Sequence, residues 1–112
     1  MAQPIWISYD LGVRGDYEGL YTWLDERGAK ECGDSLAYLI FEAKKDLVKE
    51  LTASMKDALE ITKKTRIYVI HSNARTQKPR GAWLFGGRKA PPWSGYAGGF
   101  KEDDEVDEGD EA

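Results

Sequence analysis

The sequence is poor in the residues that build disulfides and metal sites. Its 112 residues include one cysteine, Cys32, and one histidine, His71. A lone cysteine cannot form a disulfide within the chain, and it excludes a multi-thiolate metal centre for the same reason. We expect Cys32 to be a small buried apolar side chain. We expect His71 to lie on the surface at the end of a strand.

Long apolar runs are also missing. No stretch approaches the roughly 18 apolar residues of a membrane span. The opening residues, MAQPIWISYD, lack the basic segment and apolar core of a secretory signal. The sequence therefore predicts a cytoplasmic protein with no membrane partner. Apolar residues still make up 41% of the chain and aromatics 12%, which is enough for one compact core and excludes global disorder.

The charges are unevenly distributed along the chain. Residues 102–112 contain eight acids and no base, so all 16 Lys and Arg lie in residues 1–101 with the other 12 acids. The body therefore carries +4 and the tail −8, although the whole chain is −4. A basic body leaves polyanion binding open, which the whole-chain charge would have argued against. We expect the tail to be disordered.

Hydrophobic patterning predicts an alternation of strands and helices. Asp16 is a suitable helix N-cap, and Gly28 suits the end of the same helix. The expected strands cover residues 5–11, 29–32, 35–42, 66–71 and 82–85, and the expected helices cover residues 17–27 and 46–60. We expect residues 72–81 to be a polar turn. The first strand is almost continuously apolar, so we expect it to be central and buried on both faces.

This order predicts an α+β fold, a ferredoxin-like βαββαβ sandwich with an additional C-terminal strand. The expected divisions are a domain over residues 1–90, an arm rich in proline, glycine and aromatics over residues 91–101, and the acidic tail. Two helices cover only one face of such a sheet. An exposed aromatic face made by Trp6, Tyr9, Tyr38 and Tyr68 therefore predicts a homodimer.

Residues 5–71 contain motifs with a family resemblance. The motif YDL (Tyr9 to Leu11) ends a strand, the helix DYEGLYTWLDERGA follows, and Ser35 and the strand beginning RIY come later. The pattern resembles the small CRISPR-associated proteins that bridge integrase dimers during spacer acquisition, and their VapD-type relatives. The resemblance implies a ferredoxin-like homodimer with Asp10 near the dimer axis, where some members of the family have a metal-dependent nuclease activity. The sequence departs from the family after residue 72.

Asp10 is the candidate catalytic and metal-binding residue. A carboxylate at the mouth of a central strand can hold Mg²⁺, which usually takes one or two protein carboxylates. One acid per chain becomes a pair only across a two-fold axis. The alternative is structural, because an aspartate that follows a strand often caps the next loop. In that case Asp10 would accept from the amide of Gly12 or pair with Arg14.

Basic and aromatic residues are interleaved around the last strand. Cations beside aromatic faces suit phosphates and unstacked bases of RNA or DNA. The cations of this region are Arg75, Lys78, Arg80, Arg88 and Lys89, and the aromatics are Trp83, Phe85 and Trp93. We predict that Arg14, Arg80, Arg88, Lys89 and Trp83 bind nucleic acid. The alternative is a solvated hairpin whose tryptophans cover the sheet or a partner subunit.

Two functions follow from these features. The first is a dimeric nucleic-acid-associated protein with Mg²⁺-dependent phosphodiester cleavage. The second is a non-enzymatic dimeric interaction or regulatory module in which Asp10 is structural.

Overall fold

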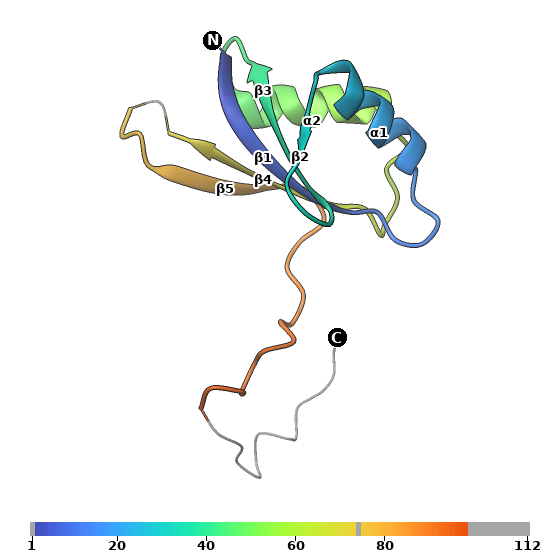
Figure 1. Cartoon of the computed structure of the whole chain (residues 1–112), viewed down its shortest axis with the longest axis vertical. Helices are drawn as coiled ribbons and strands as arrows, with labels where there is room; N and C mark the ends of the chain where they lie inside the picture. Colours follow the sequence, from blue (N-terminus) through green and yellow to red (C-terminus); the bar gives the residue numbers. More distant parts are fainter. Residues whose placement is uncertain (1, 74, 99–112) are drawn as a thin grey trace.

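The computed structural model describes residues 2–73 and 75–98. These residues form a mixed α/β domain of two helices and one antiparallel sheet of five strands (Figure 1). The helices are α1 (Tyr17–Glu26) and α2 (Leu47–Ala58). The strands are β1 (Ala2–Asp10), β2 (Lys30–Glu31), β3 (Leu36–Glu42), β4 (Arg66–Ser72) and β5 (Pro79–Phe85).

The strand order in the sheet is β2-β3-β1-β4-β5, so β1 is central. It pairs with β3 from Ala2↔Glu42 to Ser8↔Leu36 and with β4 from Ile5↔His71 to Asp10↔Arg66. Both helices lie on one side of the sheet, and the chain leaves the end of β5 on the other side (Figure 1). No helix among the described residues therefore covers the other face of the sheet.

Aspartate side chains start both helices. The carboxylate of Asp16 accepts from the Gly19 amide at 2.9 Å, and that of Asp46 accepts from the Lys49 amide at 3.2 Å. These bonds satisfy amides that have no partner inside the first helical turn. Asp16 also accepts from the Glu60 amide at 2.9 Å, which ties the start of α1 to the segment that follows α2.

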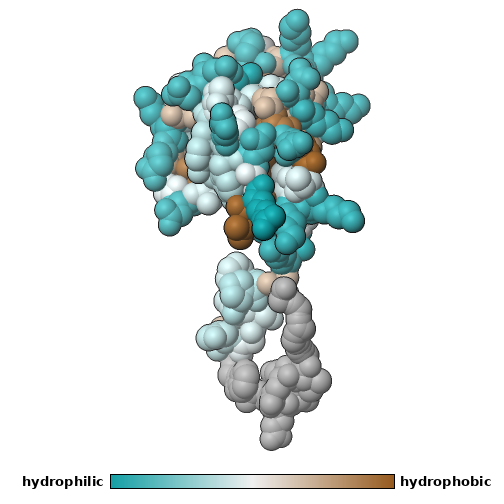
Figure 2. Space-filling view, turned by 90° about the vertical axis from the view of Figure 1, so that its right-hand side faces the viewer, coloured by the Kyte–Doolittle hydropathy of each residue, from teal (hydrophilic) through white to brown (hydrophobic). Residues whose placement is uncertain are grey.

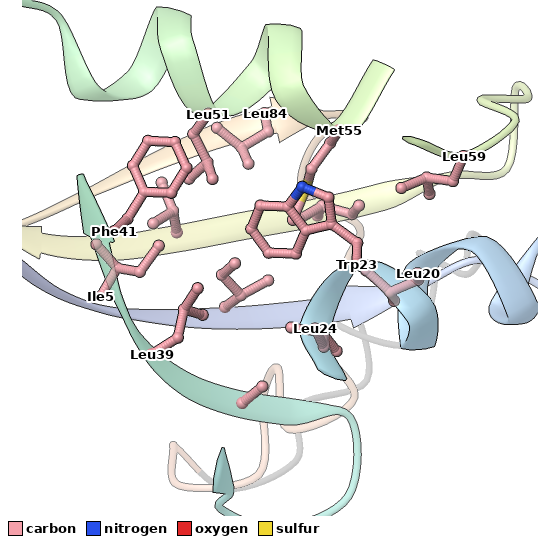
Figure 3. Packing of buried hydrophobic residues seen from close by; sticks show 14 of the residues in the cluster. Ile5, Leu20, Trp23, Leu24, Leu39, Phe41, Leu51, Met55, Leu59 and Leu84 are labelled. Carbon is pink, nitrogen blue, oxygen red and sulfur yellow. The ribbon is translucent and has the colours of Figure 1, made fainter. Parts of the chain in front are cut away.

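The core lies between the helices and the covered face of the sheet (Figure 3). Trp23 of α1 reaches it with its ring plane 28° from that of Phe41, and its indole N–H donates to Ser54 of α2 at 2.9 Å. Leu51 and Met55 of α2 are fully buried, as are Ile5 and Ile7 of β1. This packing fixes the covered face, because alternate residues of each strand must point toward the helices.

The structure corrects three expectations about burial. β1 is central, but only one of its faces is buried, since Trp6, Ser8 and Asp10 are exposed. Tyr9 does not join the aromatic residues of the uncovered face, because it packs on the core and beside Tyr21. Cys32 is exposed instead of buried, because it follows the short edge strand β2.

Several expected boundaries are also corrected. β1 occupies residues 2–10 instead of 5–11, and α2 ends at Ala58 instead of residue 60. β5 begins at Pro79, so three residues of the expected polar turn belong to the strand. The acidic tail and the last three residues of the expected arm lie outside the described residues. No described helix has the length and apolar character that a membrane crossing requires.

Candidate functional site

The uncovered face of the sheet has two unlike halves. Trp6 lies between Tyr38 and Ile70 in the register of β3, β1 and β4, and its ring centroid is 5.1 Å from that of Tyr38. The side chain of Ile40 is 50% exposed beside them. We call these four residues the apolar half. Three of them, Trp6, Ile40 and Ile70, are large apolar side chains that remain in contact with water.

The other half is hollowed where the chain leaves β5, and we call this hollow the arm groove. It has a volume of about 580 Å³. Its sides are the uncovered faces of β1, β4 and β5 and residues 88–93. From here on we call residues 88–98 the arm, although the arm expected from the sequence begins at residue 91. The residues that line it are Ser8, Arg66, Tyr68, Trp83, Arg88, Lys89, Ala90, Pro91, Pro92 and Trp93.

Tyr68 and Trp83 form the floor of the arm groove. They are paired across β4 and β5, and their ring centroids are 4.9 Å apart with planes at 65°. Gly81 makes this arrangement possible, because a Cβ atom at residue 81 would overlap the Tyr68 hydroxyl. The short side chain of Ser8, opposite Tyr68 on β1, leaves the space above the floor open.

Arg66 connects the floor to the arm. Its Nε donates to the carbonyl oxygen of Gly87 at 3.1 Å, and its guanidinium carbon lies 5.2 Å from the centre of the Trp83 ring. Gly86 has a φ of +77°, and a Cβ atom there would come within 2.8 Å of the Thr65 carbonyl oxygen. Only glycine fits this position without strain, so the turn that brings the arm across Arg66 depends on it.

The arm supplies the remaining cations and a third aromatic residue. The guanidinium carbon of Arg88 lies 5.6 Å from the centre of the Tyr68 ring, and Lys89 follows it along the wall of the arm groove. Trp93 lines the same groove and is 72% exposed. Figure 2 shows the arm as a projection below the body of the domain. Cationic and aromatic side chains therefore meet on one concave surface.

The indole N–H of Trp83 is buried and has no acceptor among the described residues. A buried donor without a partner costs roughly 1–3 kcal/mol. Such groups are rare in folded proteins and often mark a place where water or a ligand supplies the acceptor.

Asp10 lies at the end of β1 beside this groove, and the structure gives it two structural partners. Its Oδ1 accepts from the Gly12 amide at 3.1 Å, as the structural alternative predicts. Its Oδ2 lies 3.5 Å from a guanidinium nitrogen of Arg66, so the ion pair is with Arg66 and not with Arg14. The side chain is still 52% exposed. No group of three or more His, Cys, Asp or Glu suited to a metal ion occurs among the described residues.

The predicted binding residues do not all come together. Arg88, Lys89 and Trp83 line the arm groove. Arg80 is paired with His71, on the alternate set of positions that faces the helices, so it points away from Trp83. Arg14 belongs to the loop between β1 and α1 and does not line the groove. Ser35 lies in the turn before β3, and its carbonyl oxygen accepts from the Tyr9 amide at 3.0 Å.

Sequence reasoning missed Arg66, which lines the arm groove and contacts both Trp83 and the Gly87 carbonyl oxygen. A signal for it was present, since Arg66 and Tyr68 are two residues apart in an expected strand and must share a face. Their relation to residues 83–93 depends on the pairing of β4 with β5, which the patterning alone did not specify.

Comparisons with known proteins return no match to this chain, whether with family models, with curated proteins or with solved structures. The family resemblance of residues 5–71 therefore rests on sequence motifs alone.

Proposed function

We propose that this protein binds nucleic acid in the arm groove. The observation that carries the proposal is the meeting of three cations, Arg66, Arg88 and Lys89, with the aromatic rings of Tyr68, Trp83 and Trp93. Cations attract phosphates and release the counterions condensed around them. Aromatic rings add stacking with bases, which tolerates any sequence.

A ferredoxin-like fold is part of the proposal. Without the edge strand β5, the strand order reads β4-β1-β3-β2, all antiparallel, with both helices on one face. In this reading β5 is the additional C-terminal strand, and it supplies Trp83. The same reading agrees with the resemblance to the CRISPR-associated and VapD-type proteins.

We also propose that the protein is a homodimer joined through the apolar half. Trp6, Tyr38, Ile40 and Ile70 form a continuous surface on three neighbouring strands. Burying such a surface against a second copy removes apolar area from water. The arm groove lies at the other half of the same face, so a dimer of this kind leaves it open to a ligand.

Titration of a fluorescently labelled oligonucleotide, followed by anisotropy over a series of salt concentrations, tests the binding. The variant carries both Arg88→Ala and Lys89→Ala. We expect weaker binding at low salt and a shallower dependence of log affinity on log salt, by about 1.4 for two lost contacts with a single strand.

The matched control carries Lys44→Ala and Lys45→Ala. It removes the same charge from the exposed loop before α2, far along the chain from the arm groove. If both double variants lose affinity and salt dependence equally, the net charge of the chain governs binding and the arm groove does not.

Mg²⁺-dependent phosphodiester cleavage through Asp10 is a second candidate function. The half-exposed carboxylate at the end of the central strand favours it. Among the described residues Asp10 belongs to no group of three or more potential metal ligands, and its two carboxylate oxygens interact with the Gly12 amide and with Arg66. In this hypothesis the second carboxylate is Asp10 of another copy.

Asp10→Asn separates the two roles of this side chain. Asparagine keeps an oxygen that can accept from Gly12, but it loses the negative charge that a metal ion needs. If Asp10 binds Mg²⁺, the variant loses Mg²⁺-dependent cleavage of an end-labelled oligonucleotide while its melting temperature stays near that of the wild type. Cleavage at the wild-type rate would end the catalytic hypothesis.

A further inference from the structure

We propose that the arm groove holds one unpaired base of a single strand, with Trp93 closing over it against the floor of Tyr68 and Trp83. The inference rests on the proposed function and adds a substrate class to it. The ligand is single-stranded RNA or DNA, recognised through the face of a splayed base and its neighbouring phosphates, and a duplex is excluded from the groove.

The dimensions of the groove suit a nucleotide. Its volume of about 580 Å³ lies inside the range of roughly 300–1,000 Å³ that is usual for small-ligand sites. Two of its sides are aromatic, since Tyr68 and Trp83 lie on the sheet and Trp93 on the arm. A flat base inserted between them would be covered on both faces.

The backbone of the arm is restricted next to Trp93. Pro91 and Pro92 precede it, and each proline ring fixes its own φ angle. The amide of Ser94 donates to the Pro91 carbonyl oxygen at 3.2 Å, and the amide of Tyr96 donates to that of Trp93 at 3.1 Å. These turns restrict the backbone on both sides of Trp93, which lowers the entropy lost when its ring closes on a ligand.

The charge of the groove fits a phosphate chain. Of the ten described residues that line it, three are cations and none is an acid. Arg66 and Arg88 lie near the two rings of the floor, so a base on these rings would place its phosphates within reach of both guanidinium groups. The buried indole N–H of Trp83 lacks an acceptor among the described residues, and bases and phosphates both carry hydrogen-bond acceptors.

A duplex does not expose the base faces that the arm groove is proposed to bind. Paired bases are stacked on their neighbours, so their faces are covered and only their edges are exposed. Proteins that read bases through aromatic side chains therefore act on unstacked bases in single strands, loops or ends.

The experiment uses the full-length protein and a short oligo-dT that carries one 2-aminopurine. We expect quenching of 2-aminopurine fluorescence on binding, because stacking on an aromatic ring quenches it. An RNA strand of the same design tests the other backbone. A blunt duplex and a strand of the same length in which every residue is abasic serve as competitors. Both competitors should bind more weakly than the intact single strand.

Trp93→Ala is the informative variant, because Trp93 is exposed and its loss leaves the core intact. We expect the affinity to fall about tenfold and most of the quenching to be lost. Trp93→Phe should restore much of both. Tyr96→Ala is the control, since Tyr96 is an equally exposed aromatic of the same arm that does not line the groove.

Failure of this inference and failure of the proposed function give different results. If a strand binds but the duplex or the abasic strand competes as well as the intact one, the groove holds phosphates and no base, and the inference is wrong. Equal effects of Trp93→Ala and Tyr96→Ala would also overturn it. If neither single strand nor duplex binds at low salt, the proposed function fails and the inference fails with it.

Discussion

The contacts of Arg66 depend more on where its side chain lies than on its charge. Its guanidinium group contacts the carboxylate of Asp10, the carbonyl oxygen of Gly87 and the ring of Trp83. These partners belong to β1, to the turn that leads into the arm and to β5. An exposed ion pair alone contributes little stability. The same side chain that positions the arm also supplies a cation to the arm groove.

Gly81→Ala tests whether the floor of the arm groove is needed. A methyl group at residue 81 meets the ring and hydroxyl of Tyr68, so the ring must move away from Trp83. We expect a lower melting temperature and weaker oligonucleotide binding by anisotropy. Gly87→Ala is the control, because a Cβ atom there has no neighbour within 4 Å. Unchanged binding by Gly81→Ala would show that the Tyr68 ring is not part of the binding surface.

At the scale of residues, the sequence predicted local contacts better than distant ones. The bond between Asp10 and the Gly12 amide was one of the alternatives considered, because the two residues are neighbours in the chain. The ion pair of Asp10 joins residues 56 positions apart and was assigned to the nearer Arg14. Cys32 was expected to be buried from its residue type, but its position after an edge strand decides its exposure.

At the scale of elements, Glu50 fixes the entry to α2. Its two carboxylate oxygens accept from the amides of Lys44, Lys45 and Asp46 at 2.7–2.9 Å. These bonds hold the pKa of Glu50 below its ordinary value of 4.5. The folded state therefore favours the ionised form, and the stability that Glu50 contributes is present above its unfolded pKa and lost as the pH falls through the folded pKa.

Glu50→Gln should therefore lower the melting temperature by a few degrees at neutral pH and have less effect at acidic pH. Below pH 4.5, where the wild type begins to lose this contribution, the two curves should approach each other. Thermal melts followed by circular dichroism over a pH series give the comparison. Asp57→Asn, an exposed residue near the other end of α2, is the control. A constant difference at every pH would contradict the role of the carboxylate charge.

The helices were predicted within a few residues because their starting signals are local. Asp16 was predicted as the N-cap of α1, and it accepts from the amide three residues ahead. Asp46 does the same for α2, although the sequence analysis placed it inside the helix. The predicted strand at residues 82–85 was too short, because the first residues of β5 are Pro79, Arg80 and Gly81, which are not typical of a strand. They form one because β4 offers partners, and Tyr68 fits over Gly81. The start of β5 is therefore determined by its pairing with β4, which the composition of residues 79–81 does not indicate.

At the scale of the whole molecule, the proposed homodimer should dissociate when a charge is placed on the apolar half. Sedimentation equilibrium of the wild type at micromolar concentration should give about twice 12.6 kDa. Ile40→Glu places a charge on that surface and should shift the mass toward that of one chain. Val13→Glu is the control, since Val13 is 98% exposed in the loop after β1. A wild type that sediments as one chain would contradict the proposed dimer.

The uneven charge of the chain gives a second prediction at this scale. Deleting residues 102–112 removes eight acids from a chain whose other residues carry +4. We expect tighter oligonucleotide binding at low salt, because these acids compete with phosphates for the same cations. The difference should shrink as salt rises. A chain of unchanged length with the eight acids replaced by Asn and Gln should behave like the deletion. Equal affinity of all three proteins would show that the acids do not reach the basic surface.

The central place of β1 also shapes how the chain reaches its folded state. Ser8 must meet Leu36 and Asp10 must meet Arg66, so the strand that forms the middle of the sheet leaves the ribosome before either of its neighbours. Closing such loops costs entropy before the stabilising contacts form, and folds dominated by distant contacts therefore form slowly. The β4–β5 hairpin and α2 can form from neighbouring residues. We therefore expect β1 to enter last between two partners, in a transition that completes the sheet and the core together.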